Sequence, residues 1–342
     1  MAGIPFVAPI ENLRYAEVDV VAPNIRRVIA RNPSKFTFTG TGTYIVGAPE
    51  DRSVVVIDPG PDLPEHRDAL LRAVGDARVG AIVVTHCHSD HVGLAAWLKS
   101  ETGAPFVAWR KHGVTGEIDN EDDMKVMEEL KPPPKSPEEI EKDRETARLA
   151  GLDPDDMEQR ETVDTEFQPD VAVADGEVFA RGSGWSLSGV HTPGHTSNHM
   201  CVSLDEDGVL FTGDHIMGWS TTVVSPPDGD MRDYMDSLRK VQGRHDRVLW
   251  PTHGNAVTDP ATFVGAYYEH RLGREAQVLA CIASGVNTVA PMVRQMYAAV
   301  VPELHIPAAR SVLSHLTQLV QDGRLRVVGG GPARLSATYE PV

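Results

Sequence analysis

Four side chains that can bind metal ions occur within the six residues HCHSDH, directly after an apolar run at residues 81–84. The apolar run is typical of a buried strand, and the polar segment is typical of the loop at its carboxyl end. Alternate residues of an extended chain point the same way, so His86 and His88 can bind one ion together. Once the chain turns, Asp90 and His91 can face a neighbouring position. Imidazole and carboxylate groups bind zinc, iron and manganese, so this segment predicts a metal site rather than an ordinary polar loop.

Three further segments place a histidine or an aspartate directly after an apolar run. His195 lies in HTPGHT, Asp214 in FTGDH and His253 in WPTHG. Loops at the carboxyl ends of strands in α/β sheets are where ligands gather. Each residue alone would more often be structural or simply exposed. Four such loops in one chain predict a shared metal centre.

The first part of the chain alternates strand-like and helix-like runs. We expect strands joined by a tight turn within 36–47, further strands at 53–57, 81–84 and 187–190, helices at 64–74, 92–99 and 231–242, and a hairpin turn across residues 205–208. This order predicts an α/β architecture for a catalytic domain over residues 1–262.

The segment 110–170 interrupts this alternation. Between Glu121 and Asp170 there are 18 Asp and Glu residues against 7 Lys and Arg residues, a local charge of −11. A short helix is expected over 137–150, with Ser136 as its N-cap. A solvated acidic insertion and a lid over the site are both compatible with this composition.

The last part of the chain has a different pattern. Helices are expected over 263–284, 288–299 and 308–322, followed by two strand-like runs, RLRVV and ARLSATYE, around three glycines. Three helices and a two-stranded wing predict a winged-helix domain over 263–342.

Charge and cysteine content limit the partners and the compartment. The net charge of −17 would repel a polyanion such as RNA unless a local basic surface intervened. Three cysteines at unrelated spacings argue against a disulfide scaffold and suit a reducing compartment. The sequence shows neither a signal-peptide pattern nor an apolar stretch of roughly 20 residues, so we expect a cytoplasmic protein with no membrane partner.

The motifs T-H-x-H-x-D-H, H-T-P-G-H-T, T-G-D and T-H-G resemble those of the metallo-β-lactamase superfamily, over residues 43–254. The tail, including HRLGREAQVL and AARSVLSHLTQLVQDGRL, is similar to the small winged-helix domain of the LACTB2-like branch. The resemblance implies an αβ/βα sandwich with two divalent metal ions at one edge between the sheets. Zinc is the ion we expect, with iron and manganese as alternatives.

The resemblance also implies a role for each ligand. His86, His88 and His195 would hold the first ion, Asp90, His91 and His253 the second, and Asp214 would bridge both. Asp58 matches a carboxylate that orients a ligand histidine, although a strand-ending turn residue would look the same.

The implied chemistry is hydrolysis by a hydroxide that bridges the two ions. Asp90 and Asp214 are the expected catalytic residues, with Asp90 orienting the nucleophile. Residues that flank the ligand segments are candidates for substrate contact, although packing roles suit them equally well. They are His199, His215, Trp219 and Ser220.

Three functions remain to be distinguished. We favour hydrolysis of a small ester-, lactone- or thioester-like substrate, because no Lys/Arg stripe accompanies the ligands. The alternative is a LACTB2-like endoribonuclease or phosphodiesterase acting on single-stranded RNA, with Arg294, Arg310, Arg324 and Arg326 in the winged helix. A non-catalytic nucleic-acid-binding regulator is a third hypothesis, but a structural metal site would use about four closed ligands. We expect the winged helix to form a homodimer or to shape the substrate cleft.

Overall fold

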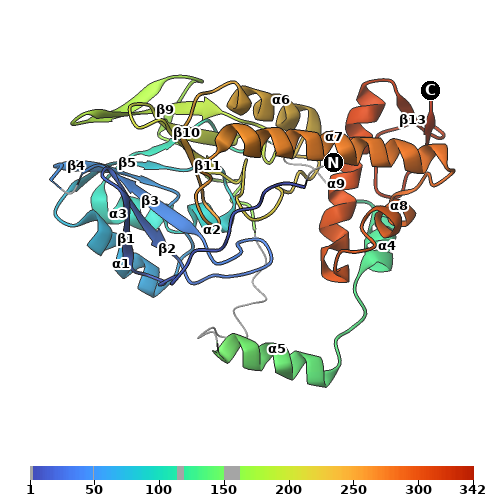
Figure 1. The fold of residues 1–342 in the computed structure, drawn as a ribbon, viewed down its shortest axis with the longest axis horizontal. Coiled ribbons are helices and arrows are strands. Elements are labelled where there is room, and N and C mark those ends of the chain that lie inside the picture. Colours follow the sequence, from blue (N-terminus) through green and yellow to red (C-terminus); the bar gives the residue numbers. More distant parts are fainter. Residues whose placement is uncertain (1–2, 49, 114–118, 150–161) are drawn as a thin grey trace.

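Two β-sheets face each other, and helices cover their outer faces (Figure 1). The structure is a computed structural model that describes residues 3–48, 50–113, 119–149 and 162–342. Seven strands form one sheet in the order β1-β2-β3-β4-β5-β6-β7, and five form the other in the order β12-β11-β10-β9-β8. The αβ/βα sandwich expected from the sequence is confirmed.

The larger sheet contains β1 (Val18–Ala22), β2 (Ile25–Ile29), β3 (Gly42–Val46), β4 (Ser53–Ile57), β5 (Arg78–Val83), β6 (Phe106–Ala108) and β7 (Val171–Ala172). The smaller sheet contains β8 (Val178–Gly182), β9 (Trp185–His191), β10 (Met200–Leu204), β11 (Val209–Gly213) and β12 (Val248–Pro251). Strands β4 to β7 run parallel to one another, as do β11 and β12, so their carboxyl ends lie at common edges.

The helices of the sandwich are α1 (Pro64–Val74), α2 (Ser89–Val92), α3 (Ala95–Thr102) and α6 (Met231–Gln242). Helices α1 and α3 pack on the larger sheet, and α6 packs on the smaller sheet together with the first half of α7 (Pro260–Ala283). A third apolar layer lies between the sheets and includes Tyr44, Val202 and Phe211. Three apolar layers in series hold the ends of the parallel strands in fixed positions.

The remaining elements form the winged-helix domain and the acidic insertion. They are α8 (Val289–Met296), η2 (Pro302–Leu304), α9 (His305–Gln321), β13 (Leu325–Val327) and β14 (Tyr339–Pro341), with α4 (Glu121–Leu130) and α5 (Pro137–Leu149) in the insertion. Among the described residues, no helix has both the length and the apolar character needed to cross a membrane.

Several elements agree with the sequence-based expectations. Helix α6 covers residues 231–242, and β10 pairs antiparallel with β11 across the turn at 205–208. Ser136 caps α5, because its hydroxyl accepts a hydrogen bond from the Glu139 amide and the Glu139 carboxylate accepts one from the Ser136 amide.

Other elements differ from those expectations. Only Gly42–Val46 of the segment 36–47 forms a sheet strand, whereas the chain turns at residues 35–37, because the Ser34 hydroxyl accepts hydrogen bonds from the amides of Phe36 and Thr37. The second wing strand is short because the Ser336 amide donates to Asp123 of α4 instead of to a neighbouring strand. Strands β1 and β2 were not expected from the sequence.

The first helix of the acidic insertion belongs to the winged-helix core. Leu130 is buried in the same apolar cluster as α8 and α9, and Val126 and Met127 pack against that cluster. Asp123 is buried and accepts hydrogen bonds from the amide and hydroxyl of Ser336. The acidic insertion is therefore divided: α4 is integrated in the fold, whereas α5 stands apart in Figure 1.

Helix α7 contributes to two cores. Near its start, Phe263 and Tyr267 pack beneath the smaller sheet. Near its end, Val278 and Ile282 pack against α8 and α9. A domain boundary at residue 263 therefore lies within one continuous helix.

We expect Leu130→Ala to lower the free energy of unfolding by about 2–5 kcal/mol, because it opens a cavity in the winged-helix core. Urea and thermal unfolding followed by circular dichroism measure the change. Met124→Ala is the matched control, because Met124 lies on the same helix with 55% of its surface exposed, against 3% for Leu130. Equal stability of the two variants would contradict the docking of α4.

Candidate metal centre

The ligand segments lie where strands of the two sheets end. Strand β5 ends just before His86, and the single helical turn α2 then carries Asp90 and His91. From the smaller sheet, the loop after β9 supplies His195. This loop lies close against α6, since a Cβ on Gly194 would come within 2.3 Å of the Tyr234 Cα.

A first group of donor atoms gathers around three histidines. The Nε2 atom of His86 lies 2.9 Å from Nδ1 of His88, which lies 3.3 Å from Nε2 of His195. One donor atom of each, together with one from Asp214, falls within a 4.8 Å span. Tetrahedral zinc with bonds of 2.0–2.1 Å separates its ligands by about 3.3–3.4 Å, so these spacings suit one ion.

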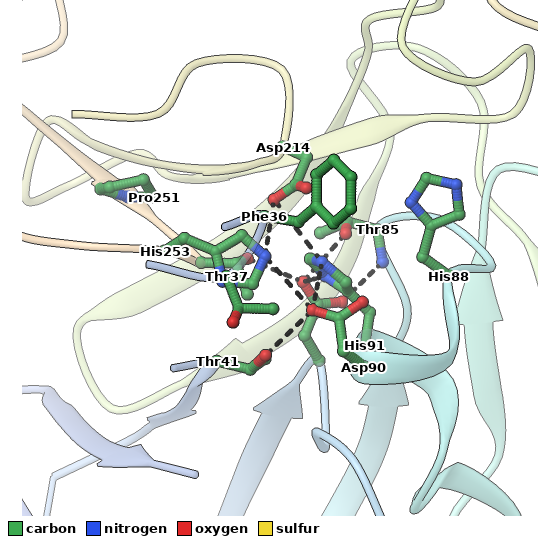
Figure 2. Close-up of polar contacts among 12 residues, drawn as sticks. Phe36, Thr37, Thr41, Thr85, His88, Asp90, His91, Asp214, Pro251 and His253 are labelled. Atoms are coloured by element: carbon green, nitrogen blue, oxygen red, sulfur yellow. Dashed lines mark hydrogen bonds and ion pairs between the residues drawn. The ribbon is translucent and has the colours of Figure 1, made fainter. Parts of the chain in front are cut away.

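A second group lies beside the first. Nε2 of His253 is 3.2 Å from Oδ2 of Asp90, and Nε2 of His91 is 3.5 Å from the same oxygen. All three side chains are buried. In Figure 2 their polar atoms point toward one another, and Asp214 lies across the two imidazole rings from Asp90.

Asp214 lies between the two groups. Its Oδ1 atom is 3.3 Å from Nε2 of His253 and 3.5 Å from Nε2 of His91, whereas Oδ2 faces Nε2 of His195 at 3.9 Å. One carboxylate oxygen thus faces each group. The structure brings all seven residues named from the sequence into one centre, with Asp214 placed to be shared.

Several polar atoms of this centre lack a hydrogen-bond partner within the described part of the chain, and their arrangement fits a pair of cations. Among the described residues, Asp90 Oδ1, His91 Nε2 and Asp214 Oδ1 are buried without a hydrogen-bond partner. Buried polar atoms are normally paired or coordinate a metal ion. The clusters are therefore suited to a dinuclear metal site, and a mixed imidazole and carboxylate set matches zinc, iron or manganese.

Asp58 orients one of the ligand histidines. Its buried carboxylate lies 2.8 Å from Nδ1 of His91 and accepts hydrogen bonds from the hydroxyls of Thr85 and Thr252. With Nδ1 held by Asp58, Nε2 of His91 is left to face the second group.

Backbone carbonyls and one hydroxyl orient the other ligands. Nδ1 of His195 donates to the Val223 carbonyl at 2.7 Å, and the Thr41 hydroxyl donates to Asp90 Oδ2 at 2.9 Å. The supporting threonines were missed in the sequence. A signal was present for two of them, because Thr85 and Thr252 each directly precede a ligand histidine.

The charges of the centre determine its proton content. Burial alone would lower the pKa of His91, but the carboxylates of Asp90, Asp58 and Asp214 raise it to about 9. Burial would also lower the pKa of His253, but the carboxylates of Asp214 and Asp90 raise it well above its ordinary value. Without ions, the second group therefore retains protons at neutral pH.

The four candidates for substrate contact fall into two pairs. His199 and His215 are fully buried, and Nε2 of His199 accepts a hydrogen bond from the Asp214 amide, so His199 supports a ligand instead of facing a substrate. Trp219 and Ser220 keep partial exposure. The ring of Trp219 stacks on Phe38, with centroids 4.6 Å apart, and Phe38 was not identified from the sequence.

We expect Asp58→Ala to weaken metal binding about 10- to 100-fold, because the His91 ring loses the group that orients it. Competition with a chromophoric chelator measures the affinity. Asp62→Ala is the control, since Asp62 forms a surface pair with Arg67. Unchanged affinity in Asp58→Ala would exclude this orienting role.

We also expect metal binding to release protons at pH 7.5. The raised pKa of about 9 means that His91 is protonated below this value in the ion-free protein, so an ion that binds the second group must displace protons. Metal affinity should therefore rise with pH up to about 9 and then level off. Titration calorimetry in buffers of different ionisation enthalpy measures the release, and an affinity independent of pH would contradict it.

Comparisons with known proteins agree with this geometry. Residues 37–253 match the model of the metallo-beta-lactamase superfamily, and residues 288–332 match that of the beta-lactamase associated winged helix domain. A crystal structure of a metallo-beta-lactamase family protein from Thermus thermophilus superposes with a TM-score of 0.67 at 20% identity, covering 94% of this chain and all of that one.

Relatives of two kinds are similar to the chain. Two fungal proteins named atrochrysone carboxyl ACP thioesterase are each 28% identical to this chain. The match to the Aspergillus fumigatus protein covers 92% of this chain and 87% of that protein. The match to the Aspergillus novofumigatus protein covers 77% of this chain and 64% of that protein. The beta-lactamase-like protein 2 homolog of Drosophila melanogaster is 29% identical, over 89% of this chain and 90% of that protein. The chain therefore belongs to the metallo-beta-lactamase superfamily of hydrolases and carries the winged helix domain associated with it.

Proposed function

We propose that the protein is a dinuclear zinc hydrolase that cleaves a small acyl thioester, with related esters and lactones as slower substrates. The observation that carries the proposal is the seven-donor centre, in which Asp214 directs one oxygen to each group. The fungal relatives named as thioesterases support this choice of bond.

The residues of the centre divide the work of hydrolysis. When bound, a pair of divalent ions supplies acidification of water and stabilisation of the negative charge that develops on the attacked carbonyl oxygen. Asp90 Oδ2 is fixed by the Thr41 hydroxyl, whereas Oδ1 has no hydrogen-bond partner among the described residues. Asp90 can therefore bind through one oxygen and hold a proton of the attacking water with the other.

An aromatic wall beside the centre suits an acyl chain. Phe38 and Trp219 stack with an interplanar angle of 8°. A Cβ on Gly254, the neighbour of the ligand His253, would lie 3.3 Å from Trp219 Cδ1. Both rings are half-buried, so they offer apolar surface beside the residues that would hold the ions.

The arginines that could favour RNA are already paired with carboxylates. The pairs are Arg294 with Glu129, Arg310 with Asp119, Arg324 with Glu275 and Arg326 with Glu340. A phosphate backbone would have to displace these partners in a chain of net charge −17. A small substrate is therefore favoured over nucleic acid.

A substrate panel tests the proposal. We expect zinc-loaded protein to hydrolyse acyl-pantetheine and acyl-coenzyme A thioesters faster than lactones, phosphodiesters or short single-stranded RNAs. Manganese- and iron-loaded samples identify the ion that gives the highest kcat/KM. Cleavage of RNA with salt-sensitive binding, in the absence of thioester turnover, would replace the thioesterase by the nuclease.

Asp214→Ala tests the shared carboxylate. We expect it to lose at least one of two bound ions, measured by elemental analysis, and to lower kcat/KM for the best substrate at least about 100-fold. Asp236→Ala is the control, because Asp236 is exposed and pairs only with Arg239 in the described structure. Full activity in Asp214→Ala would remove this residue from the mechanism.

A further inference from the structure

We infer that Tyr267 and Arg271 of helix α7 are positioning residues for the metal centre, through which the winged-helix domain and the ligand loops are mechanically linked. The inference rests on the proposed dinuclear site, but it concerns metal binding and does not depend on the substrate.

Two ligands depend on one short segment, residues 217–223. The Thr222 hydroxyl lies within hydrogen-bond distance of the carbonyl oxygens of Asp214, at 2.7 Å, and of His215, at 3.0 Å. The next residue, Val223, accepts the hydrogen bond from Nδ1 of His195. A shift of this segment would therefore move the shared carboxylate and a histidine of the first group together.

Helix α7 holds this segment through two side chains. Tyr267 and Arg271 are one helical turn apart, so they lie on the same face. The buried Tyr267 hydroxyl lies 2.5 Å from the Met217 carbonyl and also contacts the Ser220 carbonyl. The Arg271 guanidinium donates to the Thr222 carbonyl.

Arg271 also contacts elements on either side of the segment. Its Nη1 atom donates to the Ser311 hydroxyl of α9 at 3.4 Å. Its guanidinium carbon lies 5.1 Å from the ring centroid of Tyr234 in α6, whose hydroxyl donates to the His215 carbonyl. One side chain thus contacts the ligand segment, the catalytic domain and the winged-helix domain.

The burial of Arg271 argues for a positioning role. The residue is 3% exposed, and within the described residues no carboxylate forms an ion pair with it. Burying a cation without a counter-charge costs free energy, and an apolar side chain would fill the same space without that desolvation cost. The rigid, planar guanidinium can donate hydrogen bonds to several oxygens at once, which an apolar side chain cannot do.

Metal affinity and cobalt spectra of two variants test the inference. Tyr267→Phe removes one hydroxyl, and Arg271→Met removes the fork while keeping a long side chain. We expect each to weaken binding of at least one ion about 10- to 100-fold, as loss of a ligand-supporting group does. We also expect a changed d–d absorption spectrum in the cobalt-loaded protein. Arg271→Lys retains one donor group and should restore part of the affinity.

Two residues of the same helix provide matched controls. Tyr268→Phe removes a hydroxyl that contacts Arg239, and Arg274→Met removes a guanidinium that contacts Gln277 and the Met296 carbonyl. Both controls should keep wild-type affinity and spectrum.

The outcomes separate a positioning role from a structural one. Wild-type affinity and an unchanged cobalt spectrum in folded Tyr267→Phe would overturn the inference, as would equal losses in the control variants. If the wild-type protein binds two ions but hydrolyses no thioester, the proposed substrate is wrong while the metal-binding comparison still decides the inference. A wild-type protein that binds no ion would overturn both.

Discussion

The buried carboxylate of Asp58 joins the two sheets at the point where the metal centre forms. It accepts from Thr85, at the end of the larger sheet, and from Thr252, at the end of the smaller one, and it holds the ring of His91. Together with backbone hydrogen bonds such as Met200 to Thr85 and Gly42 to Thr252, this contact connects the ligand loops of the two sheets. The centre can be precise because its donors follow rigid strands and are locked by such secondary contacts.

Charge explains why so many polar groups tolerate burial at one place. Three carboxylates lie close to five imidazole rings, and several of their atoms have no hydrogen-bond partner in the described structure. In the ion-free protein, protons on His91 and His253 offset part of the negative charge, as their raised pKa values indicate. Divalent ions would replace those protons and satisfy the unpaired atoms.

The winged-helix domain is integrated with the catalytic domain at two places. Helix α4 of the acidic insertion packs in the winged-helix core, and helix α7 passes from one core to the other. Because α7 also contacts the segment that supports Asp214 and His195, the domain is better regarded as a structural support of the site than as a detachable appendage. The carboxylate-paired arginines on its surface agree with that role.

Local sequence patterns were sufficient to predict the candidate ligands, because such donors follow strand ends in short segments such as HCHSDH and WPTHG, and the structure brings these seven residues together. They also predicted α6 and the capped start of α5, since side-chain periodicity and capping are local properties. The three-dimensional structure was needed to show which histidine Asp58 contacts, that α4 joins the winged-helix core, and that Tyr267 and Arg271 contact the ligand segment. These contacts join residues far apart in the chain, and no local pattern records which distant partner a carboxylate, a hydroxyl or an apolar helix face will meet.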